Sequence, residues 1–290
     1  MKQINRMNDY FVKYLLGTEK NKHISLNFIN AVLANKDHYF TDVIFTNKDD
    51  EPVVLDGKEI RLDIKGKLNT GTIIDIEVQV RALKYMGERS LYYWARMYSR
   101  QISEGEDYNK LKPAIAINLL DYNLLPEGNW LNQYSILNTQ SHTVLSDHFN
   151  IIFIEPLKLD SKALDEMTPL ELWGAFFKRR VGDDKLKEVP IMAEALKAEM
   201  QFTASEIEDY KYEMREKALK DKAAMLSYAK EEGKAEGRIE GRIEGKAEGE
   251  NKMAQLMTLL FKEKRYEDAE KAATDPVYRA QLLQELLPEN

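Results

Sequence analysis

Acidic and amide side chains occur at alternate positions of two neighbouring segments, and their types could bind a divalent cation. One apolar residue separates Asp63 from Lys65 in the first segment, and single apolar residues separate Asp75, Glu77 and Gln79 in the second. Side chains of a strand point alternately to its two faces, so each polar set shares a face. Clustered carboxylate oxygens with open coordination positions hold Mg²⁺ in proteins, and such an ion can activate water and neutralise phosphoryl charge.

A β-hairpin is the element that would bring these two segments together. Strand-like runs at 60–65 and 72–80 are joined by a short polar turn that contains a glycine, which is a hairpin pattern. Such a turn would bring Asp63 close to Glu77 or Asp75. The same pattern also fits an ordinary hairpin with one solvated face, where a cross-strand Lys65–Glu77 ion pair would contribute about 0–1 kcal/mol. The spacing therefore leaves the metal site and the plain surface both open.

The periodicity of apolar residues changes along the chain. The first half mixes helical and strand-like patterns, whereas the second half is nearly all helical in pattern. The uninterrupted apolar run at 113–120 indicates a strand that is buried on both faces. Further elements are expected as helices at 7–16, 22–34 and 86–103, and as strands at 40–45, 131–137 and 149–155.

The same change of pattern predicts four regions. We expect a core at 1–157, a helical extension at 158–230, a charged segment at 231–251 and a small helical tail at 252–290. Aromatic residues around Trp173 are expected to give the extension a local core of its own. Apolar residues expected to hold the tail together are Leu256, Met257, Leu260, Phe261, Tyr266, Leu282, Leu283 and Leu286.

The charged segment consists of a Glu-Gly pair that recurs every four residues over 232–249, with Lys or Arg after each of the first four glycines. Each glycine costs about 1 kcal/mol relative to alanine in a helix, and like charges four positions apart repel mildly. Two interpretations remain. The segment is either a flexible charged tether or a helix that packs against a partner, with a second copy of the chain as one candidate. The sequence favours the helix that self-associates or packs on a partner.

Several blocks in fixed order resemble a known family. They are Asn8-Asp9-Tyr10-Phe11 with the following helix to Gly17, Leu26-Asn27-Phe28-Ile29-Asn30, Asp63-Ile64-Lys65 before Ile76-Glu77-Val78-Gln79, and Arg89-Ser90-Leu91-Tyr92-Tyr93-Trp94-Ala95 with Gly105-Glu106-Asp107-Tyr108. Together they resemble the bacterial PD-(D/E)XK nuclease family transposases, which are akin to the recombination-promoting (Rpn-like) nucleases. The resemblance covers roughly residues 1–160 well.

The resemblance implies an α/β fold class, with a restriction-endonuclease-like core of mixed central sheet flanked by helices and a mostly α-helical C-terminal region. It implies cleavage of DNA phosphodiesters that depends on Mg²⁺, with Mn²⁺ as an alternative ion. Carried over by position, Asp63 and Glu77 would bind the metal together with the backbone carbonyl of Val78. Gln79 would orient the attacking water or contact the scissile phosphate, and Asp9 could hold a second metal ion through water.

Gln79 stands where related nucleases usually carry lysine. A lysine supplies positive charge and can help to deprotonate water, whereas an amide supplies only a donor and an acceptor. Glutamine is itself usual in the resembled family, so activity is compatible with it, but the proton acceptor is left open. Lys65 shares a face with Asp63 and could supply the missing charge; the alternative is an ordinary solvated strand residue.

The helix expected at 86–103 carries a basic stripe. Arg89, Tyr93, Arg96 and Arg100 are spaced so that they lie opposite the expected apolar face, which suits contact with a DNA phosphate backbone. A plain solvated face is the alternative. The apolar face is expected to hold Leu91, Trp94, Ala95, Tyr98 and Ile102.

Composition limits the function further. The net charge is −7, yet residues 1–156 hold 18 Lys and Arg against 20 Asp and Glu, so the expected core is nearly neutral. The chain has no cysteine, which excludes disulfides and thiolate metal sites and suits a reducing, cytoplasmic compartment. The chain contains no run of about 18 apolar residues, so we expect no membrane-spanning helix. We therefore expect a cytoplasmic DNA endonuclease linked to mobile elements or recombination, which acts on DNA and not at a membrane. The alternative is an inactive nuclease-fold protein for DNA binding or helix-mediated assembly, including homo-oligomers.

Overall fold

The computed structural model describes residues 2–34, 39–46, 64–126 and 129–287. The chain forms two compact units, Met1–Glu216 and Lys217–Asn290. Helix α7 (Glu206–Lys262) begins in the first unit and continues into the second. The region boundaries predicted near residues 157, 230 and 251 rest on sequence pattern alone and stay predictions.

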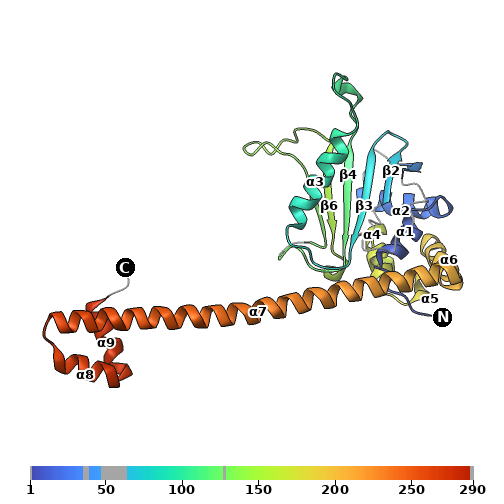
Figure 1. Ribbon diagram of the computed structural model, residues 1–290. Coiled ribbons are helices and arrows are strands. Elements are labelled where there is room, and N and C mark those ends of the chain that lie inside the picture. The colour runs from blue at the N-terminus through green and yellow to red at the C-terminus, as the bar shows by residue number, and fades with distance from the viewer. Residues whose placement is uncertain (1, 35–38, 47–63, 127–128, 288–290) are drawn as a thin grey trace. The chain divides into compact units, whose positions relative to one another are not determined.

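Among the described residues, a six-stranded mixed sheet forms the centre of the first unit (Figure 1). Strand β2 (Ile64–Leu68) pairs antiparallel with both β1 (Val43–Phe45) and β3 (Ile73–Gln79). Strands β3, β4 (Ala114–Leu120) and β6 (Phe149–Ile154) run parallel, and β5 (Leu131–Tyr134) closes the far edge antiparallel to β6. Helix α3 (Met86–Ser99) lies in the crossover that the parallel pair β3–β4 requires. In spatial order the strands are β1, β2, β3, β4, β6 and β5.

Strands β2 and β3 form a hairpin where the sequence predicts one, although β2 extends to Leu68 and residues 60–63 of the predicted first strand lie outside the described residues. The backbone N–H of Leu68 donates to the carbonyl of Thr72 at 2.8 Å, and Gly71 lies in the turn at φ 90°. Glycine adopts that angle without the steric cost that a side chain would add. The register pairs Lys65 with Asp75. Because directly paired residues of an antiparallel ladder point to the same side, Lys65 and Asp75 share a face of the sheet.

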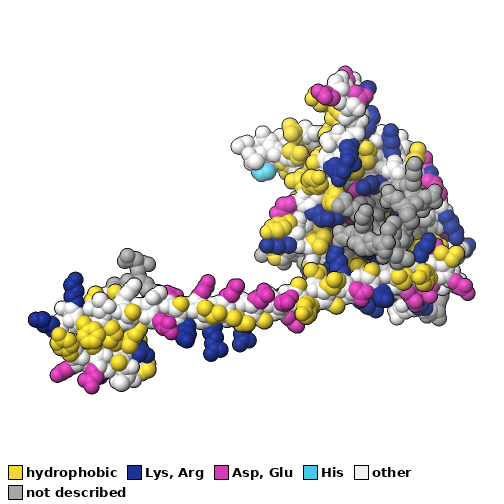
Figure 2. Space-filling model, in the orientation of Figure 1, with side chains coloured by type: hydrophobic (Ala, Val, Ile, Leu, Met, Phe, Trp, Pro, Cys, Tyr) yellow, Lys and Arg dark blue, Asp and Glu magenta, His cyan; other side chains and the backbone are white. Residues whose placement is uncertain are grey.

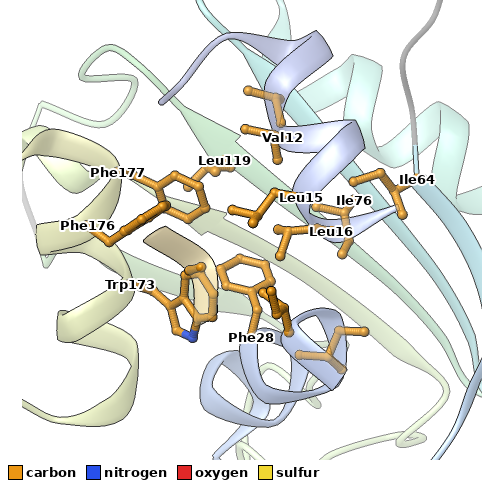
Figure 3. Close-up of a cluster of buried hydrophobic side chains, with 14 of the residues drawn as sticks. Val12, Leu15, Leu16, Phe28, Ile64, Ile76, Leu119, Trp173, Phe176 and Phe177 are labelled. Carbon is orange, nitrogen blue, oxygen red and sulfur yellow. The ribbon is translucent and has the colours of Figure 1, made fainter. Parts of the chain in front are cut away.

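One face of the sheet packs against helices from both ends of the first unit. Val12 and Leu15 of α1 (Asp9–Leu16) meet Ile76 and Leu119 of the sheet in this core, which Figure 3 shows. Helices α2 (Lys22–Leu33), α4 (Pro169–Lys178), α5 (Asp183–Leu186) and α6 (Pro190–Ala204) contribute to the same core. A parallel sheet needs cover on both faces, and these helices provide one side of it.

The prediction of a separate local core for the helical extension was wrong. Trp173 is fully buried in the same cluster as the sheet residues, and its ring lies 5.6 Å from that of Phe28 in α2. Helix α4 is fixed at its start by a capping box between Thr168 and Glu171. Residues beyond 157 therefore complete the core that covers the sheet.

Helix α3 covers the opposite face of the sheet (Figure 1). Its buried positions are Met86, Ser90 and Trp94, spaced four apart, and they pack towards β4 and β6. The predicted apolar face was partly wrong, because Leu91 and Ala95 are exposed although Trp94 and Tyr98 pack as expected. The helix is rotated so that a polar residue, Ser90, faces the sheet.

The second unit contains the continuation of α7 with α8 (Tyr266–Thr274) and α9 (Pro276–Leu286). Leu256, Leu260 and Leu282 form its core, as expected, whereas Phe261 and Tyr266 are exposed.

The glycine repeat lies within α7, and a Cβ added at any of its five glycines would meet nothing within 4 Å. Along the middle of this helix, Glu side chains lie on one edge and Lys or Arg side chains on the opposite edge (Figure 2). None of the helices in the described part of the chain combines the length and apolar character that crossing a bilayer requires.

Candidate functional site

Strand β3 carries two carboxylates on the face of the sheet that α3 covers. Asp75 is 5% exposed and Glu77 is 7% exposed. In the parallel register Glu77 lies beside Asn118 of β4, whose side-chain oxygen accepts a hydrogen bond from Ser90 of α3 at 3.0 Å. Burying a carboxylate costs free energy unless partners compensate its charge. The hairpin therefore does not have the solvated polar face of an ordinary surface hairpin.

The Gln79 amide and the Arg89 guanidinium are both neighbours of the Glu77 carboxylate. The amide of Gln79 donates to Glu77 Oε2 at 3.4 Å, and Arg89 Nε lies 3.9 Å from the same oxygen. The Arg89 guanidinium also lies 4.7 Å from the centre of the Tyr93 ring. A neighbouring residue of the same strand and the first turns of α3 thus meet at the Glu77 carboxylate.

The backbone of Val78 faces the edge of β3 that pairs with β2. The Ile73 N–H donates to the Pro113 carbonyl, and the Gln79 carbonyl accepts from the Asp121 N–H, both on the β4 side. The Thr72 carbonyl accepts from the Leu68 N–H on the β2 side. Because alternate residues of a strand present their backbone groups to opposite neighbours, the Val78 carbonyl points to the β2 side. The described part of β2 pairs with β3 only as far as Ile64–Ile76. Val78 therefore follows the last residue of β3 that has a described partner on β2.

Three predicted site residues differ in their outcome. Asp63 lies outside the described residues. Lys65 is half-buried and is paired in register with Asp75, so its neighbour across the hairpin is not the Glu77 of the simple surface-pair interpretation. Asp9 is buried, and its carboxylate accepts from Arg215 Nε at 2.9 and 3.0 Å.

The oxygen donors on β3 fit a hard divalent cation. The described residues contain no group of three or more His, Asp or Glu side chains that could hold a metal ion, so Asp9 does not join Asp75 and Glu77 in one cluster. Magnesium needs few protein ligands because it keeps several waters, and carboxylate and carbonyl oxygens are its preferred donors. The Glu77 carboxylate and the Val78 carbonyl supply such donors.

The predicted basic stripe of α3 is buried to different degrees along its length. Arg89 and Tyr93 are half-buried, with Arg89 beside Glu77, whereas Arg96 and Arg100 are exposed, Arg100 just past the end of the helix. Figure 2 shows Lys and Arg side chains gathered in the region of α3. The stripe thus divides into an inner part at the acidic strand and an outer part at the surface.

Sequence reasoning missed several residues at this site. Asn118 is a polar residue inside an apolar strand, which was the available signal, and Ser90 had none. Tyr122 follows β4, and burial raises the pKa of its hydroxyl above the usual value, although the Leu83 backbone and the Arg89 charge oppose that rise. Tyr122 therefore stays a neutral hydroxyl at neutral pH.

Comparison with known proteins shows which family this chain belongs to. A family model described as PD-(D/E)XK nuclease family transposase matches residues 6–229, which is most of the chain. Neither the curated proteins nor the solved structures gave a match. The predicted family resemblance is confirmed. The predicted fold class is confirmed too: a restriction-endonuclease-like α/β core with a mixed sheet, flanking helices and a mostly helical C-terminal region.

Proposed function

Because the chain belongs to the PD-(D/E)XK nuclease family transposases, we propose that it is a metal-dependent DNA endonuclease, linked to mobile elements or recombination. Family membership indicates a nuclease or recombination-related function; the DNA substrate, the metal and the hydrolytic reaction are the proposal. The observation that carries it is the buried Glu77 carboxylate between the Gln79 amide and the Arg89 guanidinium. Buried charge of this kind is typical of sites whose electrostatics serve chemistry.

We propose that Glu77, the Val78 carbonyl and Asp63 hold the ion. Asp63 directly precedes Ile64, and Ile64 pairs with Ile76, the neighbour of Glu77, which supports this assignment. Mg²⁺ or Mn²⁺ bound there would lower the pKa of its water and neutralise charge on the phosphate.

Gln79 is proposed to orient the attacking water. Its amide nitrogen donates to Glu77, which leaves the amide oxygen as an acceptor for a water proton. An amide does not take up that proton at neutral pH, so Gln79 positions the water and does not act as its base. Lys65, across the hairpin from Asp75, is proposed to add positive charge to this acidic face.

The exposed cations of α3 are proposed to bind DNA phosphates. Arg96 and Arg100 face solvent, where they can contact a backbone at the salt-dependent strength that phosphate contacts give. Arg89 and Tyr93 lie further in and connect this surface to Glu77.

The test is cleavage of supercoiled plasmid by the purified full chain, with an RNA of similar length in parallel. We expect nicked or linear DNA with Mg²⁺ or Mn²⁺, little cleavage of RNA, and none of either with EDTA. Cleavage of RNA but not of DNA would show that the substrate is RNA and not DNA. A folded protein that cleaves neither would overturn the proposal.

A second function is supported by α7 itself. Ile239 and Ile243 are exposed on a helix whose Glu and Lys or Arg rows could pair with those of a second copy. We propose that these C-terminal helices mediate association of the chain with itself. Light scattering should give a multimer for the full chain and a smaller species for Ile239→Ser/Ile243→Ser. A monomer at all concentrations would contradict this.

A further inference from the structure

We propose that Tyr85 and Tyr92 form a stacking platform for unpaired bases, so that the site takes a single-stranded stretch of DNA. This inference rests on the proposed nuclease function and adds the form of the substrate. In a duplex the faces of the bases are covered by their neighbours, and only the edges are open in the grooves. In a single strand the faces can stack on aromatic side chains.

Both tyrosines present their rings to solvent. Tyr85 is 62% exposed and Tyr92 is 61% exposed. The Tyr92 ring packs edge-on against that of Tyr93, with centroids 5.5 Å apart, which limits its freedom. Leu83 and Leu91 are exposed nearby in sequence, so aromatic and apolar surface is concentrated at the start of α3.

The backbone holds Tyr85 in a fixed position. It is the residue before α3 and adopts φ 63°, ψ 37°, the left-handed region that bulky side chains rarely occupy. Its carbonyl accepts from the backbone N–H of Arg89 at 2.9 Å, which ties it to the first turn. Tyr92 follows seven positions later, about two helical turns further along the chain. Both exposed rings are thus carried by the start of α3 and the residue before it.

The local charge suits a nucleic acid strand. Residues 81–100 hold five Lys and Arg but a single Glu, in a chain whose net charge is −7. Lys84 Nζ lies 4.7 Å from the centre of the Tyr85 ring. Cations interleaved with exposed aromatic rings are the combination that binds single strands with little dependence on sequence.

Arg89 connects the helix that carries Tyr92 to the proposed catalytic carboxylate. Arg89, whose amide binds the Tyr85 carbonyl, places its side chain 3.9 Å from Glu77. A strand whose bases stack on Tyr85 and Tyr92 would lie along α3, the helix that covers the acidic face of β3.

The test compares an oligo-dT strand with a duplex of the same length, by fluorescence anisotropy of the full chain in EDTA, so that no cleavage occurs. Tyr85→Ala and Tyr92→Ala should each weaken binding of the single strand about fivefold or more and change duplex binding less than about twofold. Tyr85→Phe and Tyr92→Phe should keep parent affinity, because phenylalanine also stacks. Tyr210→Ala removes an equally exposed (61%) tyrosine of α7 and should change neither.

Unchanged single-strand affinity in both alanine variants would overturn the inference, as would an equal loss on both DNA forms. Plasmid cleavage with Mg²⁺ separates this outcome from the proposed function. Cleavage without tyrosine-dependent binding leaves the nuclease and removes the platform. Tyrosine-dependent binding without cleavage leaves the platform and removes the nuclease.

Discussion

Arg89 of α3 lies 3.9 Å from the carboxylate of Glu77 on β3. The crossover geometry explains the contact, because α3 starts seven residues after β3 ends and runs back over the face on which Glu77 lies. A basic helix and an acidic strand thus form one site. The contact also gives the buried carboxylate a compensating positive charge.

We predict that Arg89→Ala lowers the single-turnover rate of DNA cleavage by about tenfold or more, with Arg89→Lys intermediate, because lysine restores charge without the planar guanidinium. Arg96→Ala is the matched control on the exposed side of the same helix. It should weaken DNA binding and reduce its salt dependence while leaving the rate at saturating DNA unchanged. An Arg89→Ala variant that behaves like Arg96→Ala would contradict the distinction between inner and outer cations.

Gln79 offers a direct test of how water is positioned. Gln79→Leu keeps the size of the side chain but removes both the donor to Glu77 and the free acceptor, so cleavage should fall about 100-fold. Gln79→Lys should retain at least the parent rate, because lysine supplies charge at the same position. Rates are measured at saturating Mg²⁺ and DNA. Full activity of Gln79→Leu would show that the amide plays no part.

The hairpin and its polar face were predictable from sequence because they depend on a period of two and a glycine turn, which are local signals. The buried strand β4 was predictable from another local signal, its uninterrupted apolar run. Helix α3 was only half predictable. Its periodicity was clear, but its rotation depends on Ser90 meeting Asn118, a contact between elements.

Glu199 should be essential to the stability of the first unit. Its buried carboxylate accepts from Arg6 at 2.8 and 2.6 Å, and Arg6 also binds Asp183. Glu199→Ala leaves the buried Arg6 charge without that partner, so we predict a loss of about 3–5 kcal/mol in unfolding free energy. Urea unfolding measures it. The double variant Arg6→Met/Glu199→Leu should lose less than the two single changes combined, and strict additivity would contradict the coupling.

The Asp9–Arg215 ion pair should contribute to stability through both of its members. Because the Asp9 carboxylate is engaged by Arg215, Asp9→Ala and Arg215→Ala should lower the unfolding free energy by similar amounts and leave cleavage per folded molecule nearly unchanged. Urea unfolding and plasmid cleavage are measured on the same preparations. A selective loss of cleavage in Asp9→Ala would instead support the metal-binding role that the family resemblance implied.

The contacts of Asp9 and Trp173 explain what sequence could not supply. Asp9 and its partner are 206 positions apart, and Trp173 packs on Phe28 of a distant helix. No local period encodes which remote surface an aromatic or charged side chain will meet. Composition could not place them either, because the pairing depends on how the helices cover the sheet.

Cleavage of plasmid DNA by Glu77→Gln in Mg²⁺ tests the proposed nuclease site most directly. The substitution keeps the size of the side chain and removes the charge that would hold the ion. Glu104→Gln, at an exposed position, is the control, and thermal unfolding confirms that both variants fold. We predict that Glu77→Gln cleaves about 100-fold or more slowly than the parent while Glu104→Gln keeps the parent rate. A folded Glu77→Gln protein that cleaves at the parent rate would contradict the assignment of Glu77 to the metal site.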